Sequence, residues 1–225
     1  MKRTSIAALV LGLLLAALPA LGQQYTSTPD EYENGFGELS LNAGFALPLG
    51  NVGGNVTMND AMNFGVPFGI AVGYRIAGSV FVGGTFSYAP FGSPGGSNVG
   101  ACNTSGVSCS SFTFHTGFTV QWHPLGSRGF DPYIGLGAGY EWLYVDVSDA
   151  GLSSTIQYNG FTWLDVPLGV DFRLGKDIRL GPYFDFSMGE YRSGSISYPA
   201  VSGLIAQRSI HFWLSAGLRI VFLSL

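Results

Sequence analysis

The residues of this chain that could do chemistry are single ionisable side chains set among apolar and small residues. Charged residues make up only 11% of the 225 positions. Isolated charges in a narrow, water-poor interior cannot stay ionised alone, so they must pair with one another or meet water. The ionisable residues that share one face of a repeated two-residue alternation are Arg75, His115, Glu141, Asp165, Asp171, Arg173, Asp185 and Arg219.

Glu38 lies at one end of the same polar face. If the alternating segments are strands of a closed barrel, as argued below, this set of residues has two interpretations. It could form a plug that fills the barrel interior and fixes the register of the strands, which is the interpretation we favour. It could instead line a narrow conduit that is gated by exchange of ion pairs. In both cases the chemistry is ion pairing, and we expect no cofactor and no metal.

The chain has two cysteines, Cys102 and Cys109, within a Gly- and Ser-rich segment. An exported chain meets an oxidising compartment, so we predict a disulfide that staples this loop; two free thiols are the alternative. The spacing is wrong for a metal or redox motif, and no histidine lies beside the pair.

A period of two residues positions the ionisable side chains. In the clearest segment Leu164, Val166 and Leu168 alternate with Asp165 and Pro167, so one face is apolar and the other is charged or small. The eight segments with this pattern are 38–49, 63–76, 80–91, 112–125, 132–146, 161–174, 180–192 and 210–223. Each could cross a bilayer at a tilt, so we predict an all-β fold, an eight-stranded antiparallel up-and-down transmembrane β-barrel.

The polar face decides between two kinds of barrel. A soluble lipocalin-like barrel needs a densely charged outer face, whereas this face is mostly Gly, Ala, Ser and Thr, which suits a cramped lumen. The bulky residues lie on the apolar face, which indicates contact with outer-membrane lipids. An aromatic girdle is predicted at its two ends, formed by Tyr74, Trp122, Tyr140, Trp142 and Tyr144.

The connections between the segments alternate in length, as in outer-membrane barrels. The short ones, predicted as periplasmic turns, are 77–79, 126–131 and 175–179. The long ones, predicted as outer loops, are 50–62, 92–111, 147–160 and 193–209. Both chain ends should then lie in the periplasm.

The short turn at 126–131 also predicts a register. If Leu125 pairs with Asp131, then His115 lies opposite Glu141 on the lumen face. We expect these two side chains to touch and to form a candidate pH-sensitive pair.

The first 22 residues are typical of a Sec signal peptide: a cationic start at Lys2 and Arg3, an apolar run and a small-residue exit. An uncleaved anchor fits less well, because the apolar run is shorter than a membrane-spanning helix needs. Residues 23–37 should form a short polar periplasmic segment and residues 38–225 the barrel. A net charge of −4 argues against a nucleic-acid partner, because the chain has no cationic footprint.

The runs 132–140 (PYIGLGAGY) and 217–222 (GLRIVF) resemble the small eight-stranded outer-membrane barrels of the OmpA transmembrane-domain, OmpX and OmpW type, and the resemblance covers residues 38–225. It implies a porin-like monomer in the cell envelope of a Gram-negative bacterium. Leu218, Ile220 and Phe222 are similar to the terminal signal read by the outer-membrane insertion machinery, although three residues follow Phe222 here.

The same resemblance implies a structural or surface role, with narrow-pore activity as an extension of it. Two alternatives stay open: OmpW-like passage of small apolar molecules through a side opening near Pro67 and Pro167, and adhesion through the outer loops. A lipid A-modifying enzyme is less well supported. A deacylase of that type needs a lipid-facing histidine, but His115 and His211 fall on the lumen face, and a palmitoyl transferase needs an apolar lumen. We therefore expect no catalytic residues.

Overall fold

The computed structural model describes residues 35–54, 56–92, 106–126, 129–149, 152–197, 201–205 and 208–224. The predicted signal peptide and Cys102 lie outside the described residues. Within the described part of the chain, no helix has the length and hydropathy needed to cross a membrane.

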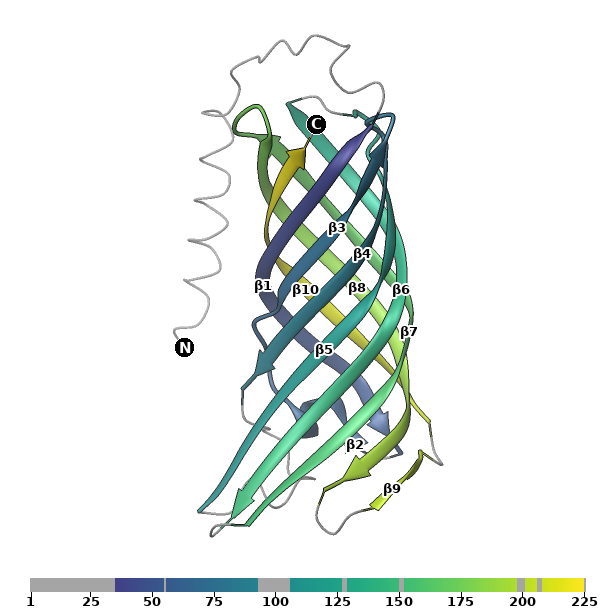
Figure 1. Ribbon diagram of the computed structural model, residues 1–225. Coiled ribbons are helices and arrows are strands. Elements are labelled where there is room, and N and C mark those ends of the chain that lie inside the picture. The colour runs from purple at the N-terminus through teal and green to yellow at the C-terminus, as the bar shows by residue number, and fades with distance from the viewer. Residues whose placement is uncertain are drawn as a thin grey trace. The chain divides into compact units, whose positions relative to one another are not determined.

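Eight long strands form a closed antiparallel ring, which confirms the predicted fold (Figure 1). Around the ring the order is β10-β1-β3-β4-β5-β6-β7-β8, and β10 closes it by pairing with both β1 and β8. The strands are β1 (Phe36–Gly53), β3 (Phe68–Ile76), β4 (Val80–Phe91), β5 (Val107–Trp122), β6 (Phe130–Asp149), β7 (Leu152–Arg173), β8 (Ile178–Ile196) and β10 (Ile210–Ser224).

Three small elements lie at one end of the ring. They are β2 (Val56–Thr57), the four-residue helix α2 (Met58–Ala61) and β9 (Val201–Leu204). The β3–β4, β5–β6 and β7–β8 connections lie at the other end, together with the C-terminal end of β10 (Figure 1). Following the predicted orientation, we call the end with these three connections the periplasmic end and the opposite end the outer end.

In the closed ring, the apolar residues of each strand point outward and the polar residues point inward. Phe45, Phe118 and Leu136 point outward and are 66%, 63% and 62% exposed, whereas Glu38 and Gln121, on the other face, are 2% and 4% exposed. An apolar surface that continues around the ring is far larger than a soluble monomer exposes. The outer face is therefore suited to lipid and the inner face holds the polar side chains.

The predicted segment 63–76 is wrong over its first residues, because β3 begins only at Phe68. Pro67 has no N–H, so it accepts a hydrogen bond from the Gly44 N–H at 3.2 Å without returning one. The register survives this interruption, since Gly65 bridges to Ala46 on β1 and to Phe91 on β4.

The predicted long loop at 147–160 is also wrong. Strands β6 and β7 continue to Asp149 and Leu152, which pair with each other, so only two residues connect them. β5 likewise begins at Val107 instead of 112, and β8 continues to Ile196 and pairs with β9. The prediction ended each strand where the bilayer pattern ended, but backbone pairing with the neighbouring strands continues through the Ser-rich residues beyond it.

The alternation in β7 breaks once, at Trp163. The register with β6 and with β8 shifts by one residue around this position, which is a β-bulge. The side chains of Phe161, Trp163 and Leu164 therefore all point outward, and those of Phe161 and Trp163 are exposed. Thr162 is 2% exposed and points inward.

The face assignment can be tested at mid-strand. Leu136→Arg places a charge on the outward face of β6 and should weaken insertion into lipid vesicles by about 2–4 kcal/mol. The fraction inserted is measured as the heat-modifiable band on a gel after refolding.

The matched control is Leu204→Arg on β9, where the leucine is 77% exposed but lies in the small outer element. This variant should insert like the wild type. Equal losses in both variants would contradict the assignment of the outward face to lipid.

Candidate functional site

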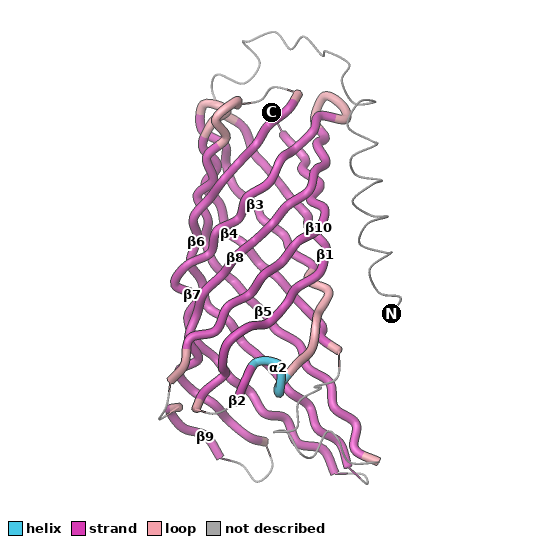
Figure 2. The backbone as a smooth tube through the Cα atoms, turned by 180° about the vertical axis from the view of Figure 1, so that it is seen from behind, coloured by secondary structure: helices cyan, strands magenta, loops and turns pink. Residues whose placement is uncertain are grey.

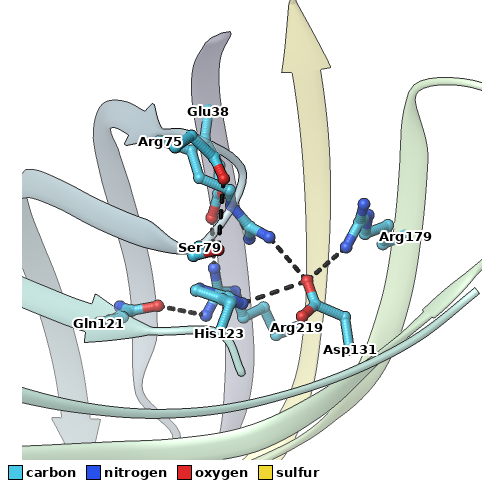
Figure 3. Close-up of polar contacts among 9 residues, drawn as sticks. Glu38, Arg75, Ser79, Gln121, His123, Asp131, Arg179 and Arg219 are labelled. Carbon is cyan, nitrogen blue, oxygen red and sulfur yellow. Dashed lines mark hydrogen bonds and ion pairs between the residues drawn. The ribbon is translucent and has the colours of Figure 1, made fainter. Parts of the chain in front are cut away.

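The inward polar residues gather in layers across the lumen. The first layer, whose contacts are drawn in Figure 3, lies near the periplasmic end. At its centre, Asp131 Oδ2 accepts hydrogen bonds from Arg75 Nη1 at 2.6 Å and from Arg179 Nη1, and lies 3.1 Å from His123 Nδ1. All four side chains are 0% or 1% exposed. Charge-assisted bonds of this kind are the strong ones, and this carboxylate has three partners.

Arg75 connects Asp131 to a second carboxylate in the same layer. Glu38 accepts from Arg75 Nε at 2.7 Å and from Arg219 Nη2 at 2.6 Å. Arg219 also donates to Gln121 Oε1 at 2.9 Å and lies 4.4 Å from the ring centre of Tyr133. We call this group the periplasmic ion-pair layer; it consists of Glu38, Arg75, Gln121, His123, Asp131, Arg179 and Arg219.

The periplasmic ion-pair layer ties together residues from six strands and one turn. It draws on β1, β3, β5, β6, β8 and β10, with His123 from the turn after β5. These strands deliver their side chains to one level because each contributes a residue of the inward face close to the same end of the ring. The layer therefore crosses the lumen from wall to wall.

Asp171 lies beside this layer and is 0% exposed, and neither of its carboxylate oxygens makes a hydrogen bond with another described residue. One potential ligand atom from each of His123, Asp131 and Asp171 lies within 4.8 Å of the other two. Formal charge argues against a metal ion here. The carboxylates of Glu38, Asp131 and Asp171 balance the guanidinium groups of Arg75, Arg179 and Arg219, so a divalent ion would leave an uncompensated buried charge.

A second polar layer lies toward the outer end. Glu141, which is 3% exposed, accepts hydrogen bonds from the Tyr191 hydroxyl and from Trp213 Nε1, the latter at 2.8 Å. His211 Nε2 lies 3.7 Å from Glu141 Oε1, and the His211 ring stacks on Tyr191 with 4.2 Å between ring centres. We call Glu141, Tyr191, His211 and Trp213 the outer polar layer.

A cavity of about 150 Å³ lies between the two layers. Arg219 and Gln121 of the periplasmic ion-pair layer and Glu141 and Trp213 of the outer polar layer line it. The wall between them includes His115, Asp165 and Asp185, which the sequence placed inside the barrel.

Seven of the eight predicted polar residues fall into three groups, and Arg173 lies apart from them. Arg75, Asp171 and Arg219 lie at the periplasmic layer, Glu141 lies in the outer polar layer, and His115, Asp165 and Asp185 line the cavity. Arg173 donates from Nε and Nη2 to the carbonyls of Gly175 and Lys176 in the β7–β8 turn.

The predicted register of β5 and β6 is confirmed, with His115 opposite Glu141 and Gln121 opposite Gly135. The side-chain contact differs from the prediction. Glu141 takes its hydrogen bonds from Tyr191 and Trp213, and His115 Nε2 makes none with a described residue. The pairing of two adjacent strands could be derived from the length of the turn between them. The contacts of Glu141 with Tyr191 and Trp213 could not, because these side chains come from β8 and β10 and reach Glu141 across the lumen.

The predicted set of lumen residues lacks Asp131, His123 and Arg179, the centre of the periplasmic layer. Asp131 and Arg179 fall in the predicted turns, although they continue the odd-numbered inward series of β6 and β8. Extending each of these two alternations by one residue finds them. His123 lies on the polar face of the predicted segment 112–125, and the pattern gives no sign that it joins the ion pairs.

The other predicted sites lie on the wall. Tyr74 and Trp122 are 49% and 56% exposed at the periplasmic ends of β3 and β5. On β6, Tyr140 and Trp142 have ring centres 4.7 Å apart, and Tyr144 stacks on Phe112. Leu218, Ile220 and Phe222 lie on β10, the strand that closes the ring. Cys109 lies on β5 and is buried, but the disulfide stays a prediction because Cys102 is outside the described residues.

Comparison with known proteins identifies the fold. No family model and no curated protein matches the sequence. The solved structure of the outer membrane protein OprG from Pseudomonas aeruginosa matches with a TM-score of 0.50 at 14% identity, over 85% of this chain and 99% of that one.

Two further matches are weaker. A major outer membrane protein from Thermus thermophilus gives a TM-score of 0.49 at 16% identity, over 83% of this chain and 99% of that one. Neisserial surface protein A gives 0.48 at 16% identity, over 81% and 95%. The ring topology and the match to OprG agree: the chain has the fold of the small eight-stranded outer-membrane β-barrels.

Proposed function

We propose that the protein is an integral outer-membrane β-barrel with a structural and surface role, and that its lumen is closed to free diffusion. The observation that carries this proposal is the periplasmic ion-pair layer, in which the buried Asp131 carboxylate has Arg75, Arg179 and His123 as partners. A solute could pass only by separating these groups. Removing one partner of a buried ion pair costs about 3–5 kcal/mol, so an open state would be rare.

The outward face supports the location. The exposed apolar side chains surround the ring. Strands β5 to β7 extend farthest at the outer end (Figure 1), and this part of β5 carries the exposed hydroxyl residues Ser108 and Ser110. This extension offers a surface for contact, which fits a surface role.

Location is tested by fractionation of a Gram-negative host that expresses the full chain. We expect the protein in the outer-membrane fraction, with a gel mobility that changes on heating. Recovery of the folded protein from the soluble periplasm would favour a lipocalin-like barrel instead.

The closed lumen is tested by conductance in planar bilayers. The refolded wild type should be silent, whereas Asp131→Asn should show discrete openings, because Arg75 and Arg179 lose their shared anion and would draw water into the layer. The matched control is Asp146→Asn on the outer part of β6, where the carboxylate accepts from Thr155 Oγ1 at 2.6 Å.

The control should be as silent as the wild type. Steady openings of the wild type, equal to those of Asp131→Asn, would refute the closed lumen and favour the narrow conduit.

A second function has one specific observation in its favour. Ile70 and Phe86 face outward and are 45% and 46% exposed, and they are cross-strand partners on β3 and β4, yet both also line the central cavity. Their inward neighbours are small, including Gly69 and Ala71. The wall is therefore thin here, close to the Pro67 interruption, and small apolar molecules could leave the cavity sideways into lipid.

This lateral route is tested by filling the cavity beside it. Ala71→Phe, on the inward face of β3, should slow entry of the apolar fluorescent probe N-phenylnaphthylamine into cells several-fold. Val72→Phe, its outward neighbour, is the control and should leave the rate unchanged. Equal rates in both variants and in cells without the protein would exclude the route.

A further inference from the structure

The outer mouth of the lumen is filled by apolar side chains from β1 and from the segment that joins it to β3. Val52, Met58, Ala61 and Met62 are between 0% and 3% exposed, and we call these four residues the outer lid. Figure 2 shows helix α2, which carries Met58 and Ala61, at the end of the barrel opposite the C-terminus. An isolated helix of four residues is unstable in water, so its position depends on the contacts of these side chains with the barrel.

Two side chains belong both to the packing of the outer lid and to the outer polar layer beneath it. Tyr191 and Trp213 are members of the buried apolar cluster that contains Met58 and Met62. The same two residues donate the hydrogen bonds that Glu141 accepts. Each therefore has one end in the apolar packing and its polar atom on a carboxylate.

Glu141 differs from the carboxylates of the periplasmic layer. Glu38 and Asp131 each contact two guanidinium groups, whereas the ion-pair partner of Glu141 among the described residues is His211, at 3.7 Å. His115 faces it from β5 across the strand pair. A buried carboxylate with no guanidinium or ammonium partner is costly without hydrogen bonds, so the Tyr191 and Trp213 donors are held firmly in place.

We propose that Glu141 is the latch of the outer lid. By holding Tyr191 and Trp213 in one orientation, the carboxylate maintains the surface on which Met58 and Met62 pack. When one of these hydrogen bonds is lost, the outer lid lifts from the mouth and the central cavity becomes accessible from outside. The inference rests on the proposed closed barrel and names its outer gate.

The experiment measures access to Met58 in intact cells. Met58→Cys is made in a chain that also carries Cys102→Ser and Cys109→Ser, and a membrane-impermeant maleimide is added from outside. Labelling should be slow in this chain. With Tyr191→Phe added it should be roughly 10-fold faster, because this change removes a hydrogen bond to a charged group and leaves the ring that packs under the lid.

Tyr183→Phe is the matched control. Tyr183 is a second buried tyrosine on β8 that lines the cavity, and it is not a member of the cluster that contains the lid. This change should leave the labelling rate of Met58→Cys as it was. Ser108→Cys, at an exposed position on the outer part of β5, reports access of the reagent and should react fast in every chain.

Three results would overturn the latch. They are fast labelling without any change at Tyr191, slow labelling with Tyr191→Phe, and an equal acceleration by Tyr183→Phe. If Tyr191→Phe lacks heat-modifiable migration, Trp213→Phe removes the other donor and takes its place. The conductance of the wild type tests the closed lumen separately from the latch. If the wild type shows steady openings while Met58→Cys is labelled slowly, the closed lumen is refuted and the latch is not.

Discussion

The constraint on which the rest of this structure depends is that a strand in lipid has no water to bond its backbone. All backbone groups of the spanning part must pair within the protein, so the sheet must close, and β10 closes it by pairing with β1 on one side and β8 on the other. Closure gives every strand an outside and an inside. The alternation of apolar and polar residues then has one solution, with the polar side chains in the lumen.

Closure also places charged side chains in a narrow, buried lumen. Eight strands enclose a space little wider than the side chains that fill it, so most inward charges have to be compensated there. The two ends solve this differently. Near the periplasmic end, carboxylates and guanidinium groups neutralise one another around Asp131, whereas near the outer end Glu141 has neutral donors and an apolar lid above it.

This difference has a consequence for function. The periplasmic ion-pair layer links six strands through strong bonds and would be expensive to open, which suits a permanent plug. The outer lid is held by apolar packing on Tyr191 and Trp213, which in turn are bonded to one carboxylate, so we infer that this end moves at lower cost. The cavity between them would then communicate with the outside or, past Ile70 and Phe86, with the lipid, more readily than with the periplasm.

The sequence by itself determined the barrel, the two faces and the β5–β6 register, because these follow from a period of two residues and the length of one turn. It could not determine the strand ends, since backbone pairing continues past the bilayer pattern, as in β6 and β7, or stops at a proline, as at Pro67. The partners within the lumen were decided only by the tertiary structure. Asp131 meets Arg75 and Arg179, and Glu141 meets Tyr191 and Trp213, across a closed ring whose curvature brings together residues far apart in the chain.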